Sequence, residues 1–239
     1  MPVTTLFLDA GGVLVTPNWR RVSDALAAHG VRVTPAALEA ADPFARRDID
    51  FGHQPAATDR QRGWAYFNLV LHHCGVPQSA ATDLALDVLQ AYHSAQNLWE
   101  RVPAGVPEVL DRLRALGMKL VVVSNANGKL KVLFERLDLA RRFDVMLDSH
   151  EEGVEKPDPR LFEIALERSG ARRGETLHVG DLYHVDVQGA RSAGLDAVLL
   201  DPADLYAGFD CRRIRSLAEL PALVAGSRQP VAGRGTMIG

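Results

Sequence analysis

The sequence predicts an α/β protein whose core is a doubly wound parallel sheet with an inserted helical subdomain. Short runs rich in valine and leucine recur along the chain and are mostly apolar rather than alternating, which is typical of strands buried on both faces of a parallel sheet. Amphipathic helical segments separate most of these runs, and this alternation indicates right-handed βαβ crossovers. One long interval contains helical patterns without a convincing strand, and it is too long for a plain loop in a compact domain.

The core elements follow from these patterns in chain order. The expected strands are 4–10, 119–125, 143–148, 176–181 and 196–201. Between them, the segments 107–117, 128–138, 158–170 and 186–194 have apolar residues at spacings near three and four and mostly end at glycine, as helices tend to. Together they predict a Rossmann-like core over residues 1–15 and 97–225.

The interval 16–96 is predicted to be the helical insert. Its clearest helical patterns are 19–30, 60–75 and 81–96, and Trp64, Tyr66 and Phe67 are expected in its hydrophobic core. The last segment, 226–239, has the composition of a loop and is expected to be a disordered tail.

Composition excludes several classes of protein. The chain of 239 residues is 47% hydrophobic and 24% charged with a net charge of −3, which gives no electrostatic case for nucleic acid or an anionic membrane. No apolar stretch approaches the roughly 20 residues of a membrane helix, and the N-terminus lacks a signal-peptide pattern. Cys74 and Cys211 form neither a metal motif nor a disulfide framework. These features favour a cytoplasmic protein and leave its oligomeric state open.

Polar residues gather where the predicted strands end. Ligands of doubly wound sheets bind outside the carboxyl ends of the strands, so these side chains are expected to meet in one site. They are Asp9, Ser124, Asn125, Lys156, Gly180, Asp181 and Asp186.

In order and spacing, these residues resemble the four motifs of the haloacid dehalogenase (HAD) superfamily of hydrolases with a helical (C1-type) cap. The resemblance covers about residues 4–201, through "LDAGGVL", "VVVSNAN", "GVEKPDPRLF" and "HVGDLYHVDVQGARSAG". The last motif is the most diagnostic, because it matches the pattern GDxxxxDxxGA without a gap.

The resemblance implies a Mg²⁺-dependent phosphatase that acts on a small phosphorylated metabolite through an aspartyl-phosphate on Asp9. A carboxylate can form such an acyl phosphate, and Mg²⁺ prefers hard oxygen ligands. The expected metal ligands are Asp9, the carbonyl of Gly11, Asp181 and Asp186. Lys156 is expected to balance charge at the nucleophile, and Ser124, Asn125 and Gly12 to bind the phosphoryl group at a helix N-terminus. Ser124 and Asp186 could instead be helix caps.

Gly11 departs from the family pattern. Most phosphatases of the family carry a second aspartate there, which protonates the leaving oxygen and then activates water. Such a positioned acid–base group contributes about 10²–10⁴-fold. Either His53 or Asp50 from the cap replaces it, or the substrate has a leaving group that needs little protonation.

Other readings of the missing aspartate remain. A phosphonoacetaldehyde hydrolase needs a cap lysine, and the first lysine in the chain is Lys119. A 2-haloacid dehalogenase is disfavoured, because Asp181 would repel a carboxylate substrate. A non-catalytic protein that binds phosphate or a partner stays open. Substrate contacts from the cap are expected among Asn18, Arg20, Arg46, Arg47 and His53, whereas His178 and His184 are expected in supporting roles.

Overall fold

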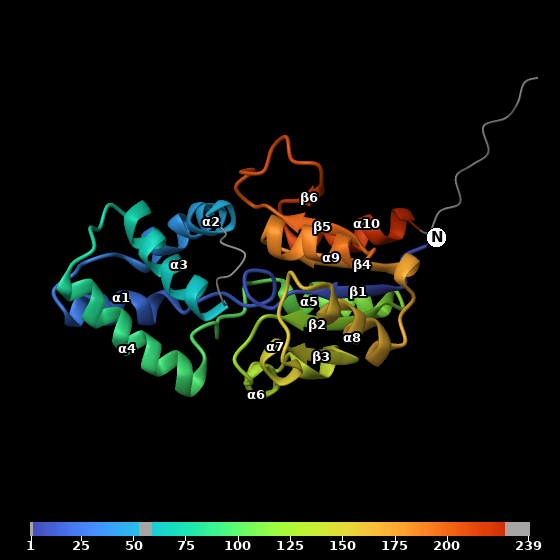
Figure 1. The fold of residues 1–239 in the computed structure, drawn as a ribbon, viewed down its shortest axis with the longest axis horizontal. Helices are drawn as coiled ribbons and strands as arrows, with labels where there is room; N and C mark the ends of the chain where they lie inside the picture. The colour runs from blue at the N-terminus through green and yellow to red at the C-terminus, as the bar shows by residue number, and fades with distance from the viewer. Residues whose placement is uncertain (1, 53–58, 228–239) are drawn as a thin grey trace, which may run out of the picture.

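The computed structural model describes residues 2–52 and 59–227, with side chains in the second range from residue 64 onward. Within these residues, six strands form one parallel sheet in the order β3-β2-β1-β4-β5-β6 (Figure 1). The strands are β1 (Thr5–Leu8), β2 (Lys119–Ser124), β3 (Val145–Asp148), β4 (Thr176–Gly180), β5 (Asp196–Leu200) and β6 (Arg212–Ile214). The predicted fold class is confirmed, and β6 was missed because a three-residue edge strand with two arginines carries no apolar run.

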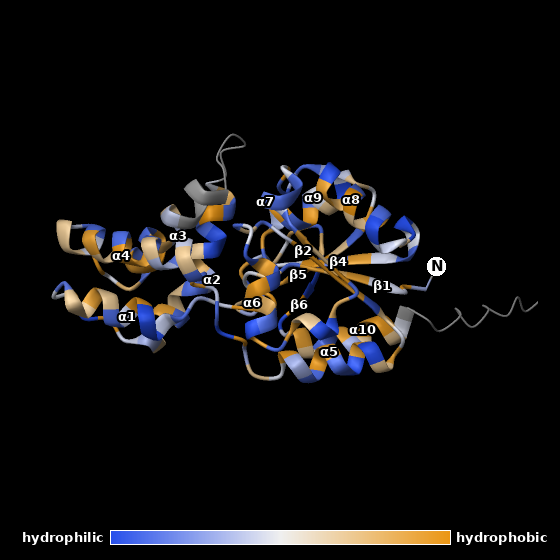
Figure 2. Ribbon diagram, turned by 90° about the horizontal axis from the view of Figure 1, so that it is seen from below, coloured by the Kyte–Doolittle hydropathy of each residue, from blue (hydrophilic) through white to orange (hydrophobic). Residues whose placement is uncertain are grey.

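Helices cover both faces of the sheet (Figure 2). On one face, α5 (Val106–Ala115), α6 (Leu130–Arg136) and α10 (Leu220–Ser227) pack against Leu6 and Leu8 of β1. On the other face, α8 (Pro159–Ser169) and α9 (Gly189–Ser192) pack against Phe7. The shorter elements are η1 (Ala140–Arg142), α7 (Ser149–Glu152), η2 (Arg173–Glu175), the π-helical η3 (Tyr183–Gln188) and η4 (Leu217–Glu219). Because β1 is covered on both sides, its carboxyl end is held rigidly at the middle of the sheet.

Helices α1 (Trp19–Ala28), α2 (Pro35–Phe51), α3 (Asp59–His73) and α4 (Ala80–Gln96) lie together beyond the carboxyl ends of the strands (Figures 1 and 2). They have a hydrophobic cluster of their own, in which Tyr66 and Phe67 are buried as expected, whereas Trp64 is only partly buried. The sequence gave no clear signal for α2, because Pro43 lies inside it and proline normally breaks a helix. Its start is nevertheless well marked, since the Thr34 side chain accepts the Ala37 N–H and proline takes the first helical position.

The chain enters and leaves this helical insert at adjacent points. The Thr16 N–H donates to the carbonyl of Arg101 at 2.8 Å, and the Arg101 N–H donates to the carbonyl of Thr16 at 3.1 Å. The division into a core (1–15 and 97–225) and a cap (16–96) stays a prediction. Helix α10 continues to Ser227, so the predicted tail 226–239 begins helically, and the rest of it lies outside the described residues. Among the described helices, none is both long and apolar enough to cross a bilayer.

Candidate functional site

A cavity of about 1050 Å³ lies between the carboxyl ends of the strands and the helical insert. Asp9 after β1, Ser124 at the end of β2 and Asp181 after β4 line it from the core, and Arg46 of α2 lines it from the insert. The strand-end residues therefore meet in one place, as the parallel sheet requires. Their catalytic and binding roles remain predictions.

Lys156 is the electrostatic centre of the cavity. Its Nζ lies 2.9 Å from Asp9 Oδ1 and 2.6 Å from Asp186 Oδ1, and the side chain is only 1% exposed. Burial alone would lower the pKa of Lys156, but the carboxylates of Asp186 and Asp9 outweigh it and hold that pKa above its usual range. The lysine is therefore a fixed positive charge beside the predicted nucleophile.

The carboxylate of Asp186 is fully committed to neighbouring groups. Oδ1 accepts Lys156 Nζ and lies 3.0 Å from His178 Nε2, and Oδ2 accepts the N–H groups of Asp181 and Leu182, both at 3.1 Å. Burial would raise the pKa of Asp186, but Lys156 and His178 hold it below its usual range. Asp186 is thus no helix cap, and its geometry favours orienting Lys156 and contacting a metal through water rather than directly.

Gly180 makes this arrangement possible. A Cβ on residue 180 would lie 2.0 Å from Asp186 Cγ, which is an impossible contact. The glycine of the "GD" pair therefore lets Asp186 approach the backbone after β4.

Asp9, Asp181 and Asp186 fit a divalent cation. Each offers one carboxylate oxygen, and these oxygens all lie within 4.8 Å of one another. Burial, together with the Asp186 and Asp9 carboxylates, raises the pKa of Asp181 to about 8 although Arg46 opposes the shift. A hard cation would relieve this crowding of buried negative charge, and carboxylate oxygens are its preferred donors.

Arg46 reaches from α2 into this acidic cluster. Its Nη1 lies 2.9 Å from Asp181 Oδ2, and its Nε and Nη2 bind Asp42, which also accepts the Tyr66 hydroxyl. Burial would lower the pKa of Arg46, but Asp42 and Asp181 hold it well above its usual range. Arg46 is the one predicted cap contact that touches the strand-end cluster in the described residues. The spacing of Asp42 and Arg46, one helical turn apart, was the sequence signal for this buried pair.

The turn after β1 depends on Gly12 more than on Gly11. Gly12 has a φ of +80°, and a Cβ there would lie 2.3 Å from Asp181 Oδ2 and 2.1 Å from Arg46 Nη1. Gly11 has no positive φ, and a Cβ there would meet Trp99 at an ordinary 3.5 Å. Gly12 is therefore required by close approach and backbone shape, whereas Gly11 leaves room for a Cβ.

The second motif differs from expectation. The expected helix N-terminus is not at Ser124, because α6 begins only at Leu130, and Ser124 caps no helix. The side-chain amide of Asn125 donates to the Lys156 carbonyl at 2.9 Å and accepts the Lys156 N–H at 2.8 Å. Its side chain therefore positions the lysine rather than a phosphate, which leaves only the backbone of Asn125 and Ser124 Oγ as candidate phosphate donors.

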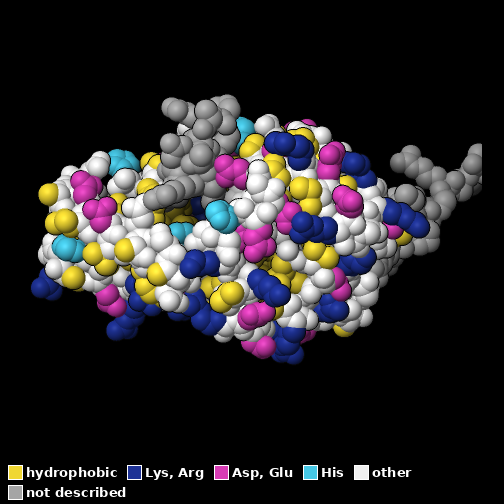
Figure 3. All heavy atoms as spheres, turned by 60° about the horizontal axis from the view of Figure 1, so that its bottom comes forward, with side chains coloured by type: hydrophobic (Ala, Val, Ile, Leu, Met, Phe, Trp, Pro, Cys, Tyr) yellow, Lys and Arg dark blue, Asp and Glu magenta, His cyan; other side chains and the backbone are white. Residues whose placement is uncertain are grey.

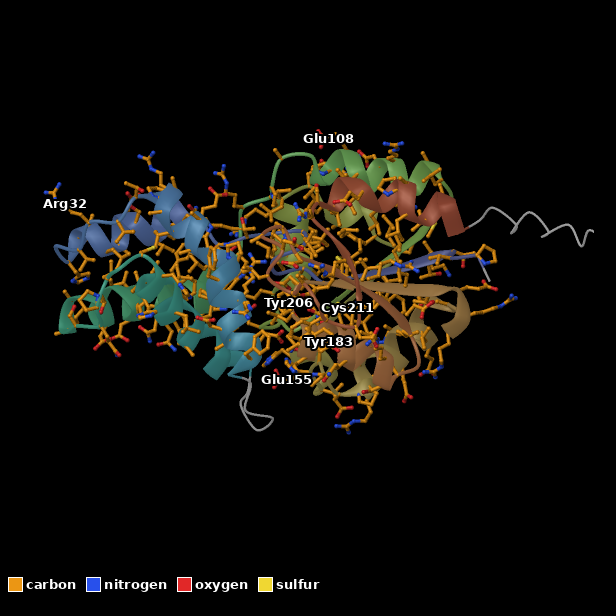
Figure 4. All side chains as sticks on the ribbon, turned by 90° about the horizontal axis from the view of Figure 1, so that it is seen from above. Arg32, Glu108, Glu155, Tyr183, Tyr206 and Cys211 are labelled. Carbon is orange, nitrogen blue, oxygen red and sulfur yellow. The ribbon has the colours of Figure 1, made fainter. Side chains whose placement is uncertain are left out.

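Asp50 does not serve as a free acid–base group. Its carboxylate accepts the N–H groups of Tyr183 and His184, both at 2.9 Å, and the Tyr206 hydroxyl at 3.0 Å. Burial raises the pKa of Asp50, and these hydrogen bonds oppose the shift. Asp50 instead fastens the end of α2 to the core, on the side where Figure 4 places Tyr183 and Tyr206 close together.

The remaining predicted cap contacts lie elsewhere. Asn18 caps α1 and binds Glu100, and Arg20 is exposed beside Asp24; both line a separate cavity of about 320 Å³ on the insert. Arg47 lies over the ring of Phe51, and His53 lies outside the described residues. On the face shown in Figure 3, side chains of both charges are interspersed rather than gathered into a basic patch.

Sequence comparisons place this geometry in a known family. The model of the haloacid dehalogenase-like hydrolase family matches residues 3–194. A relative, haloacid dehalogenase-like hydrolase domain-containing protein 3 of Mus musculus, is 35% identical over 181 residues, covering 72% of this chain and 70% of that protein.

Two relatives are named as phosphatases. Ribulose-1,5-bisphosphate 5-phosphatase of Halopiger xanaduensis is 32% identical over 163 residues, covering 66% of each chain. Glyceraldehyde 3-phosphate phosphatase of Pyrococcus abyssi is 35% identical over 111 residues, covering 45% of this chain and 46% of that one.

Solved structures share the fold across different activities. The magnesium-bound HAD-hydrolase YfnB of Bacillus subtilis superposes with a TM-score of 0.66 at 18% identity, covering 94% of this chain and all (100%) of that one. A 2-haloacid dehalogenase of Pseudomonas syringae superposes with a TM-score of 0.58 at 22% identity, covering 94% and 99%. The fold alone therefore does not separate phosphatase from dehalogenase.

Proposed function

The chain belongs to the haloacid dehalogenase-like hydrolase family, and we propose that it is a Mg²⁺-dependent phosphatase for small phosphorylated molecules. The observation that carries this proposal is the cluster of Asp9, Asp181 and Asp186 within 4.8 Å, with Lys156 bridging two of them. The relatives named as phosphatases favour the same activity.

The donor set assigns a role to each residue of the site. Asp9, the Gly11 carbonyl and Asp181 would hold the cation, with Asp186 contacting it through water. When bound, Mg²⁺ supplies positive charge that draws a phosphate dianion toward the carboxylates and stabilises the charge of the transferring phosphoryl group. A dehalogenase has no use for this acidic cluster, because its carboxylate substrate would be repelled.

The chain's own residues would carry the two displacements. An Asp9 oxygen attacks phosphorus, the bond to the leaving oxygen breaks, and an aspartyl-phosphate results. Lys156 neutralises charge on Asp9 and on the phosphoryl oxygens, while Asp186 and the Asn125 amide hold the lysine in place. Water then attacks phosphorus, the bond to Asp9 breaks, and phosphate leaves.

The helical insert (16–96) would act as the cap. Arg46 and Asp50 of α2 both reach the core, one at Asp181 and the other at the start of η3. We propose that these contacts close the cavity over the bound substrate and exclude water during the first displacement.

Phosphate release from a panel of sugar, nucleotide, acyl and aryl phosphates tests this function. We expect turnover that requires Mg²⁺ and falls by at least about 10³-fold in Asp9→Asn. Asp24→Asn, on the surface of α1, is the matched control and should keep its activity. Mg²⁺ binding without turnover of any substrate would instead indicate a non-catalytic phosphate-binding protein.

A further inference from the structure

One side of the cavity is aromatic. Trp64, His93 and Trp99, here called the aromatic wall, line the same cavity as Asp9. Their rings are contiguous, with centroids 6.3 Å apart for Trp64 and His93 and 5.3 Å apart for His93 and Trp99. The wall therefore offers a continuous ring surface rather than isolated side chains.

The aromatic wall begins beside Gly11. A Cβ on Gly11 would lie 3.5 Å from both Cδ1 and Nε1 of Trp99. Residue 11 is two positions after the predicted nucleophile, where the family pattern directs a side chain toward the leaving group. Trp99 thus lies where the leaving group of a substrate bound at Asp9 would extend.

Buried rings hold the aromatic wall in place. Phe67, which is 1% exposed, lies with its ring centroid 5.6 Å from both Trp64 and Trp99, and it stacks on Trp64. Tyr66, which is 6% exposed, lies 6.1 Å from Trp99 and is anchored by Asp42. With this support behind them, Trp64 and Trp99 remain partly exposed to the cavity, so the surface for a ring is already formed.

We propose that the substrates are small aryl phosphates, whose ring packs against the aromatic wall while their phosphoryl group binds at Asp9 and Lys156. This inference rests on the proposed phosphatase function. Two independent features favour it: the aromatic surface beside the leaving group, and the absence of an acid side chain at Gly11. A phenol has a pKa of about 10, whereas an alcohol resembles water at about 16, so a phenolate can leave without a proton donor.

The reaction balances without any further reactant. When an Asp9 oxygen attacks phosphorus, the electron pair of the bond between phosphorus and the aryl oxygen goes to that oxygen, which leaves as a phenolate and takes a proton from solvent. Water then cleaves the acyl phosphate, which restores the Asp9 carboxylate and releases inorganic phosphate. The net reaction converts an aryl phosphate and water into a phenol and phosphate.

Binding is tested with phosphonates, which cannot be hydrolysed. With Mg²⁺ present, we expect calorimetry to give phenylphosphonate a Kd about 10-fold lower than propylphosphonate. Trp99→Leu and Trp64→Leu should each reduce this preference to about 3-fold or less, with Trp99→Phe retaining most of it. Trp19→Phe, which lies in the insert core away from the cavity, is the control. Equal affinities for the two phosphonates would overturn the proposal.

Turnover separates ring recognition from leaving-group chemistry. Acetyl phosphate also has a good leaving group but carries no ring, so we expect Trp99→Leu to lower the ratio of kcat/KM for phenyl phosphate over acetyl phosphate by about 5–10-fold. An unchanged ratio in both tryptophan-to-leucine variants would refute the role of the wall while leaving the phosphatase function intact. If no phosphate ester is hydrolysed, the phosphatase function fails, and the phosphonate affinities still decide whether the cavity recognises a ring.

Discussion

The two sides of the cavity are built on opposite physical principles. On the core side, the charged floor of Asp9, Lys156, Asp181 and Asp186 consists of buried ions that are stable only as a set. On the insert side, the aromatic wall is stabilised by ring packing that does not depend on any single partner. The floor is therefore suited to one invariant group, a phosphate with its cation, whereas the wall can change its specificity by single substitutions.

The largest expected effect comes from removing the cation of the charged floor. Lys156→Met leaves Asp9 and Asp186 buried without their shared partner, so the free energy of unfolding should fall by about 3–5 kcal/mol. Urea denaturation measures this loss, with Lys131→Met on the exposed face of α6 as the control. A loss below about 1 kcal/mol would mean that the floor is solvated and not the tightly coupled set described above.

The two glycines after Asp9 should respond very differently to alanine. Gly12→Ala forces a Cβ into Asp181 and Arg46 at a positive φ and should cost about 2–4 kcal/mol of stability. Gly11→Ala places a methyl group in ordinary contact with Trp99 and should change stability by less than about 1 kcal/mol. Thermal unfolding of the pair tests this contrast, and similar losses at both positions would contradict it.

The fastening between insert and core is expected to be weaker than either side of the cavity. Asp50→Ala leaves the buried N–H groups of Tyr183 and His184 without their acceptor and should cost about 1–3 kcal/mol. Hydrogen exchange at these two amides should accelerate more than exchange in β1. Faster exchange throughout the sheet would show that Asp50 stabilises the whole core and not this junction.

The smallest effect concerns Arg46, which contacts both sides. Because its guanidinium pairs with Asp181, it competes with a cation for that carboxylate. Removing the guanidinium should therefore lower the Kd for Mg²⁺ by about 3–10-fold. Calorimetric titration should compare Arg46→Met/Asp42→Asn with Asp42→Asn alone, since the paired change avoids leaving a buried Asp42 charge. Weaker Mg²⁺ binding in the double variant would show that Arg46 supports the metal site.

The charged floor could be predicted from the sequence because strand periodicity places its residues at the same edge of a parallel sheet. Asp9, Lys156 and Asp181 each follow a local pattern, and the topology brings them together. The amide of Asn125 is different: its hydrogen bonds to the Lys156 backbone cross between two loops, and no local pattern specifies which group a strand-end amide will contact.

The aromatic wall was beyond sequence reasoning for a related physical reason. Trp99 follows the insert, yet it packs against Gly11 near the start of the chain, and this contact depends on how the insert sits on the core. Trp64 was expected in the insert core, and it does stack on Phe67 there. Its remaining exposure to the cavity follows from the position of α3 relative to β1, which periodicity does not encode.

The paired strands at Thr16 and Arg101 have an evolutionary consequence. Since the two crossing points of the polypeptide are hydrogen-bonded neighbours, the segment between them forms a closed excursion whose ends already meet. Such a module can be lengthened, remodelled or exchanged while the sheet keeps its register and its acids. New chemistries at the same phosphate site would then arise by grafting helices rather than by redesigning the hydrolase.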